Sequence, residues 1–154
     1  MVSMKFLYRC IIIFFIVQGC SSNMNQNDFI GMWKSTDGAS IELKEDGTYI
    51  AKKVNYYNFY LDSGFLNKRI DFTGTCKIIN KPKGNSALQL NSNSTYTDYG
   101  INKSYTMDGK SYSHKIAVSF EITGQGMFEN KPPWILYTWI GDPDDVKKYN
   151  FIKQ

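Results

Sequence analysis

Apolar and polar residues alternate along much of the chain from residue 40 onward, and this period of two constrains the fold more than any other feature. Ile41 and Leu43 alternate with polar neighbours, and the longest run covers residues 112–123. Six residues of that run would share one face: Tyr112, His114, Ile116, Val118, Phe120 and Ile122. Successive side chains of a strand point to opposite faces, and no segment shows a sustained helical period, so the pattern predicts β-strands with one buried face.

Turn residues divide the chain into eight to ten short expected strands. Glu45-Asp46-Gly47 separates the first two of them as a hairpin turn. We expect one strand around Trp33 and further strands at residues 40–44, 48–54, 69–80, 87–90, 95–99, 112–123, 134–140 and 149–152. Residues 56–66 fit a strand, a short helix or a loop. Many short strands with regular turns predict a small antiparallel β-barrel or a β-sandwich.

The first twenty residues have the layout of an export signal. Lys5 and Arg9 are followed by an apolar run over residues 10–17, and Gly19 stands directly before Cys20. The segment Val17-Gln18-Gly19-Cys20 resembles the lipobox of bacterial lipoproteins, although Gln18 departs from the usual small residue. The resemblance implies cleavage before Cys20 and attachment of fatty acyl chains such as palmitate. Ordinary secretion and a membrane helix are the alternatives, but a spanning helix needs about 20 apolar residues.

The remainder divides into a tether and one domain. Residues 1–19 would be the signal peptide, residues 20–28 the lipidated cysteine with a polar tether, and residues 29–154 a single β domain. Ser21, after the lipidated Cys20, implies an outer-membrane protein facing the periplasm in a bacterium with two membranes. Without residues 1–19 the net charge is +2, with 16 basic and 14 acidic residues. This nearly even charge balance does not indicate nucleic-acid binding. We also expect the protein to be a monomer.

The three cysteines have different expected fates. Cys10 leaves with the signal, and Cys20 carries the lipid, so Cys76 has no disulfide partner in the mature chain. Cys76 falls on the apolar face of its expected strand with Ile70, Phe72 and Ile78. We therefore expect a buried structural thiol rather than a reactive one.

Two short motifs resemble those of lipocalins and lipocalin-like barrels. Gly31-Met32-Trp33 matches the family's Gly-x-Trp, and Thr97-Asp98-Tyr99 matches its Thr-Asp-Tyr turn. The family's arginine near the final strands is missing, since Arg9 and Arg69 are the only arginines. The resemblance implies an up-and-down barrel with Trp33 across the closed end and a mouth that holds an apolar ligand.

Exposed aromatic residues are the candidates for binding. Tyr56, Tyr57 and Tyr60 lie too close in sequence for all of them to point inward. Residues 134–140, which include Trp134 and Trp139, are apolar on both faces, so that strand is either covered on both sides or exposed to a partner. With Trp33 these form the candidate ligand or partner site: Trp33, Tyr56, Tyr57, Tyr60, Trp134 and Trp139.

The sequence offers little for catalysis or metal binding. His114 is the only histidine, and its place at the end of an apolar face favours a hydrogen-bonded structural role. Asp142, Asp144 and Asp145 surround Pro143 and fit a turn better than a calcium loop. We therefore expect a non-enzymatic protein without cofactor or metal. It would bind a small apolar ligand or, alternatively, a periplasmic protein, as an immunity or inhibitor protein or an envelope assembly subunit.

Overall fold

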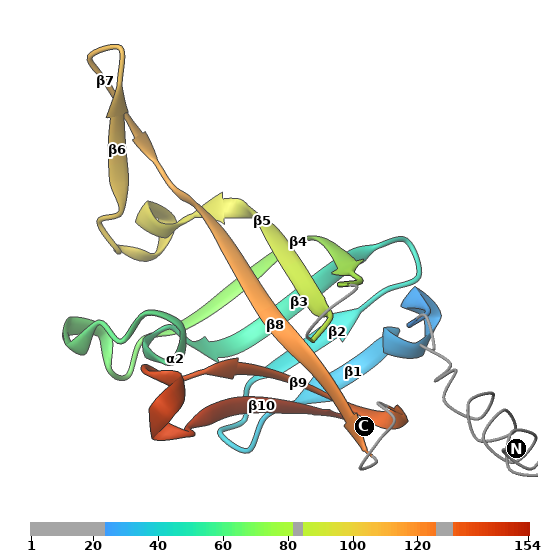
Figure 1. Ribbon diagram of the computed structural model, residues 1–154. Helices are drawn as coiled ribbons and strands as arrows, with labels where there is room; N and C mark the ends of the chain where they lie inside the picture. Colours follow the sequence, from blue (N-terminus) through green and yellow to red (C-terminus); the bar gives the residue numbers. More distant parts are fainter. Residues whose placement is uncertain (1–23, 82–84, 126–130) are drawn as a thin grey trace, which may run out of the picture.

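The computed structural model describes residues 24–81, 85–125 and 131–154, and the chain has an all-β fold (Figure 1). Eight strands close into an antiparallel barrel in the order β1-β10-β9-β8-β5-β4-β3-β2. These strands are β1 (Gly31–Lys34), β2 (Ser40–Leu43), β3 (Thr48–Asn55), β4 (Arg69–Ile79), β5 (Ala87–Thr95), β8 (Lys115–Gln125), β9 (Lys131–Trp139) and β10 (Lys148–Lys153). The prediction of an all-β fold is confirmed, with the barrel in place of the sandwich. Residues 1–19, Cys20 and the start of the tether lie outside the described residues.

The barrel strands follow one another around the sheet in chain order, with one hairpin inserted between β5 and β8. This is the up-and-down arrangement that the resemblance to lipocalins implies. The turn at residues 142–145 is also confirmed, because Asp142 caps the short 3-10 helix η5 (Pro143–Asp145) that joins β9 to β10. None of the described helices is long and apolar enough to span a membrane.

Alternation along the strands sends every second side chain into the barrel. The inward residues of β8 are buried and its outward residues are largely exposed, as the sequence pattern predicts. Aromatic rings fill the interior: Phe120 lies 5.3 Å from Phe151, and Phe151 lies 4.8 Å from Tyr149, between ring centroids. The described part of the barrel is thus packed with its own side chains, as expected for a small eight-stranded barrel.

The 3-10 helix η2 (Gln26–Phe29) closes one end of the barrel. The helix begins with a capping box formed by Asn25 and Asp28. The Phe29 ring stacks on Trp33 at 6.0 Å and on Trp134 at 5.8 Å, and the Trp33 indole N–H donates to the Phe29 carbonyl at 2.8 Å. Trp33 is fully buried. Its predicted place in the core is confirmed, and Phe29 covers it.

The opposite end is covered by residues 56–66, which form the short helix α2 (Tyr57–Tyr60) and the 3-10 helix η3 (Ser63–Phe65). Phe59 inserts its ring between Phe120, at 5.6 Å, and Tyr149, at 5.7 Å. These contacts place an aromatic plug where the lipocalin resemblance implies an open mouth.

Two expectations about strands near this end are wrong. Thr95 ends β5, and residues 96–99 form the 3-10 helix η4 (Tyr96–Tyr99) in place of a strand. Asp98 accepts the Thr95 backbone N–H at 2.7 Å, and Gly100 ends the helix at a φ of 73°. The run 112–123 is also not one strand. Its first residues belong to β7 (Lys110–Ser113), which pairs with β6 (Ser104–Met107) in a separate hairpin. Figure 1 shows this hairpin standing away from the barrel beyond the ends of β5 and β8.

Candidate functional site

The residues predicted as a binding site do not gather in one place. Trp33 and Trp134 belong to the core at the η2 end, while Tyr56, Tyr57 and Tyr60 lie at the α2 end. Trp139 lies half-buried on the outer surface of β9. The structure therefore separates them into a core pair, a tyrosine group and a surface residue.

The outer face of β9 is covered mainly by polar groups. Tyr137 is buried there, and its hydroxyl donates to Glu121 at 2.6 Å and lies 2.9 Å from the Asn85 amide nitrogen. Lys148 Nζ lies 4.4 Å from the Trp139 ring centroid. Hydrogen bonds from Asn85 and Tyr137 hold the pKa of Glu121 below its ordinary value. On this outer face Tyr137 is thus covered, whereas Ile135 and Trp139 are half-buried.

Three tyrosines, which we call the tyrosine cluster, meet at the α2 end: Tyr56, Tyr60 and Tyr96. Their ring centroids lie 5.0 Å (Tyr56–Tyr60), 5.6 Å (Tyr60–Tyr96) and 5.9 Å (Tyr56–Tyr96) apart. The Tyr60 hydroxyl hydrogen-bonds to the Tyr96 hydroxyl and donates to the Ala117 carbonyl at 3.1 Å. Burial raises the pKa of Tyr56 to about 12 and also raises the pKa values of Tyr60 and Tyr96. All three hydroxyls therefore carry their protons at neutral pH.

Lys103 reaches over the tyrosine cluster from the root of the β6–β7 hairpin. Its Nζ lies 3.5 Å from the Tyr60 ring centroid and 5.0 Å from that of Tyr96, within the range of cation–π attraction. Burial lowers the pKa of Lys103, while the more distant Asp62 acts to raise it. Within the described part of the chain, no carboxylate oxygen lies within 4.0 Å of this ammonium.

A surface cleft of about 340 Å³ opens beside this ammonium. It is lined by Tyr60, Tyr96, Lys103, His114, Lys115 and Ala117, and we call it the basic cleft. Among these lining residues, three are basic and none is acidic. The basic cleft therefore presents positive charge and aromatic surface together at the base of the hairpin.

The structure corrects the expected position of His114. The side chain is exposed and its ring lies 4.8 Å from the Tyr105 centroid, because the chain leaves the barrel between β7 and β8. Its backbone is held in place instead: the N–H donates to the Lys103 carbonyl, and the carbonyl accepts from Tyr96 N–H, both at 3.0 Å. Tyr112, expected on the same buried face, is also exposed.

The β6–β7 hairpin carries large apolar side chains in solvent. Tyr105 is 44% exposed, Met107 55% and Tyr112 39%. Tyr105 and Tyr112 are cross-strand partners, with ring centroids 5.5 Å apart. Each strand of this two-stranded sheet also leaves one backbone edge without a strand neighbour. Exposed edges and exposed aromatic residues are both typical of surfaces that bind proteins.

The sequence contained a signal for this hairpin. Asp108-Gly109 adopts positive φ values of 51° and 73°, as a two-residue hairpin turn requires. The dipeptide stands between two polar, β-compatible segments, but alternation continues through Tyr112 and His114 into β8. Because of that continuity, periodicity alone predicts a single strand. The sequence pattern does not predict that Lys103, Lys115 and Tyr96 lie together, because their proximity depends on how the barrel closes.

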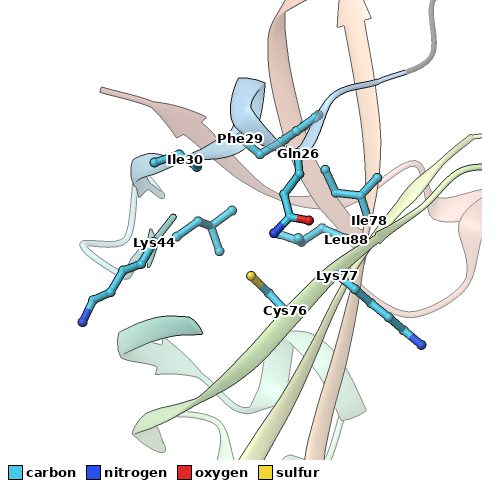
Figure 2. A pocket seen from close by; sticks show the side chains of 9 residues that line it. Gln26, Phe29, Ile30, Lys44, Cys76, Lys77, Ile78 and Leu88 are labelled. Carbon is cyan, nitrogen blue, oxygen red and sulfur yellow. The ribbon is translucent and has the colours of Figure 1, made fainter. Parts of the chain in front are cut away.

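A second pocket, at the η2 end, is shown in Figure 2. Its volume is about 10 Å³, which is about the space of one water molecule. Cys76 lines it on the same face as Ile70 and Phe72, as predicted, but the thiol is half-buried rather than fully buried. Burial raises the pKa of Cys76, and its backbone N–H donates to the Gly47 carbonyl at 2.8 Å. These features favour a structural thiol.

Within residues 24–81, 85–125 and 131–154, no three carboxylate, histidine or cysteine side chains lie together as a metal site requires. Comparison of the chain with protein-family models, curated proteins and solved structures gives no match. Function is therefore inferred from geometry and charge.

Proposed function

We propose that the protein is a lipid-anchored, non-catalytic protein of the bacterial envelope that binds another protein through the β6–β7 end of its barrel. The observation that carries this proposal is the exposed hairpin with Tyr105, Met107 and Tyr112. A lone two-stranded hairpin is only marginally stable in water. Contact with a partner would bury its aromatic side chains and occupy its backbone edges.

The packed interior favours a protein partner over a small apolar ligand. A carrier of an apolar ligand holds it in a mainly apolar cavity of roughly 300–1,000 Å³. The basic cleft is of that size, but half of its lining residues are basic. In the described part of this barrel, Phe59 plugs one end and Phe29 covers the other. An immunity or inhibitor protein, or an envelope assembly subunit, needs no such cavity.

The position of the proposed anchor fits this function. Helix η2 includes the last three residues of the predicted tether, Gln26–Asp28. It lies near Leu88 at the start of β5, whereas the hairpin leaves the barrel beyond Thr95 at the end of β5. Nine residues of strand separate the two ends by roughly 30 Å. A lipid on Cys20 would attach the protein on its η2 side, and Figure 1 shows the β6–β7 hairpin at the other end of the barrel, away from η2.

Native mass spectrometry on the mature lipidated protein, purified gently from its own host, tests the proposal. We expect a stoichiometric complex with a second protein that survives in Lys52→Ser, a change on the barrel wall, and is lost in the double variant Tyr105→Ser/Tyr112→Ser. Reconstitution with the purified partner should show at least about a tenfold loss of affinity in the double variant. A bound small molecule in place of a protein partner would contradict the proposal. A protein complex that persists unchanged in the double variant would also contradict it.

A further inference from the structure

We infer that the basic cleft binds a carboxylate, namely an aspartate or glutamate side chain of the protein partner. The inference rests on the proposed function and identifies the chemistry of the partner surface that meets the hairpin root. The cleft is lined by Lys103, His114 and Lys115, with the hydroxyl groups of Tyr60 and Tyr96 beside them. Lys103, His114 and Lys115 can each donate a hydrogen bond, and a carboxylate is an acceptor with two oxygens. The hydroxyl protons of Tyr60 and Tyr96 are already used, by the Ala117 carbonyl and by the bond between the two hydroxyls.

The ammonium of Lys103 is held in position before any ligand arrives. Tyr60 and Tyr96 fix Nζ at the edge of the cleft, at 3.5 Å and 5.0 Å from their ring centroids. A surface lysine usually loses side-chain entropy when it binds, and this loss is smaller for a group that is already restrained. The tyrosine cluster thus prepares Lys103 as a binding group.

The charge of Lys103 is also incompletely compensated. The ammonium is partly removed from water, and in the described part of the chain no carboxylate oxygen lies within 4.0 Å of it. Aromatic rings supply attraction but no hydrogen-bond acceptor of carboxylate strength. An incoming carboxylate would supply both the counter-charge and the acceptor.

The cleft is continuous with the surface that the hairpin exposes. The His114 ring, which lines the cleft, lies 4.8 Å from the Tyr105 ring, which belongs to the hairpin. A protein that covers Tyr105 and Tyr112 therefore reaches the cleft without further movement of the chain. The cleft volume of about 340 Å³ accommodates one acidic side chain with water.

A protein carboxylate is a better occupant than a lipid phosphate because of where the cleft lies. It adjoins the Thr95 end of β5, whereas η2 lies at the Leu88 end. Headgroups of the membrane that holds Cys20 would be at the η2 end. The partner side chain comes from the periplasmic direction.

The test is an NMR titration of the uniformly ¹⁵N-labelled mature protein with a blocked peptide of three glutamates, with the matching glutamine peptide and with inorganic phosphate. We expect the glutamate peptide to shift the amide signals of Lys103, His114 and Lys115, and the glutamine peptide to leave them in place. Lys103→Gln and the exposed Lys115→Gln should each weaken binding by about tenfold, as expected for loss of a charge-assisted hydrogen bond. Lys77→Gln, which removes the same charge near the η2 end, should not.

Equal binding of the two peptides, or equal weakening by Lys77→Gln, would overturn the inference, because either result indicates binding without a specific cleft. Binding of phosphate in preference to the glutamate peptide would overturn the choice of a protein carboxylate. The double variant Tyr105→Ser/Tyr112→Ser should still bind the glutamate peptide. If the peptide fails to bind while the hairpin-dependent protein complex persists, the carboxylate inference fails alone and the proposed function stands.

Discussion

Lys103 Nζ lies 3.5 Å from the centroid of the Tyr60 ring, and this contact joins the root of the β6–β7 hairpin to the helix that caps the barrel. Lys103 lies just before β6, and Tyr60 ends α2. The two elements would otherwise be separate surface features. Their contact makes the hairpin root, the cap and the basic cleft one surface, which the proposed function assigns to a protein partner.

The Phe59 ring, which plugs the α2 end of the barrel, should contribute much to the stability of the fold. Phe59→Ala removes the ring that packs against Phe120 and Tyr149, and we expect the free energy of unfolding to fall by about 2–4 kcal/mol. Urea unfolding followed by tryptophan fluorescence measures the change. Leu66→Ala, at a side chain 51% exposed, is the control and should cost less than about 0.5 kcal/mol. Similar losses in both variants would show that Phe59 is not a plug.

Gly74 should be irreplaceable in the barrel wall. A Cβ atom built at this position would lie 2.0 Å from the backbone oxygen of Asn91, so β4 and β5 would have to separate. We expect Gly74→Ala to cost about 3 kcal/mol or more, whereas Thr75→Ala, at the next and exposed position, should cost less than about 1 kcal/mol. Differential scanning calorimetry compares the two. Equal melting temperatures for Gly74→Ala and the parent would contradict the close approach of these strands.

The ion pair between Asp37 and Arg69, at 2.5 Å, should make stability depend on pH. Burial acts to raise the pKa of Asp37, but hydrogen bonds from Ala39 N–H, Arg69 and Tyr149 outweigh it and lower that pKa. A carboxyl whose pKa is lowered by folding contributes stability above its unfolded pKa of about 4, and the contribution is lost as the pH falls through the folded value. Asp37→Asn should therefore be less stable than the parent at pH 6, with the difference shrinking toward pH 2.

Urea unfolding at pH 6, 4, 3 and 2 measures this dependence. Asp108→Asn, at an exposed carboxyl in the β6–β7 turn, is the control, and its difference from the parent should stay near zero. A constant difference for Asp37→Asn at every pH would show that the ionised carboxylate is not what stabilises the barrel.

Lipid attachment should depend on Cys20 alone. Cys20→Ala should abolish incorporation of labelled palmitate in the host and move the protein from the membrane fraction to the soluble envelope fraction, since two or more acyl chains are needed for a stable anchor. Cys76→Ala removes the other mature cysteine and should leave both labelling and location unchanged. Labelling that survives Cys20→Ala would refute the lipobox interpretation.

The alternation of residues predicted most barrel strands because burial of one face is a local property of each strand. Trp33 and the inward residues Ile116 to Ile122 lie where the sequence places them. The same alternation misled at Tyr112 and His114, because a strand in an isolated hairpin alternates too while both of its faces meet solvent. Periodicity therefore predicts which side chains of a strand share a face, but not whether another part of the protein covers that face.

The candidate site was less predictable than the fold. Of the predicted residues, Tyr60 lines the basic cleft and Tyr56 belongs to the tyrosine cluster beside it. Tyr96, Lys103 and Lys115 were not among the predicted site residues and come from other segments. Their meeting depends on the 3-10 turn at Tyr96 and on the path of the chain out of β5 and back into β8. No local pattern encodes such a convergence, since each residue is unremarkable in its own segment.

Site-specific photo-crosslinking in living host cells tests the central claim most directly. A crosslinking amino acid replaces Tyr112 on the hairpin in one strain and Lys77, near the η2 end, in another, and the crosslinked peptides are sequenced by mass spectrometry. The account predicts that Tyr112 crosslinks to one protein, at a surface that carries aspartate or glutamate, and that Lys77 does not crosslink to it. Crosslinks from Lys77 to the same protein with none from Tyr112, or crosslinks from Tyr112 to lipid alone, would contradict the account.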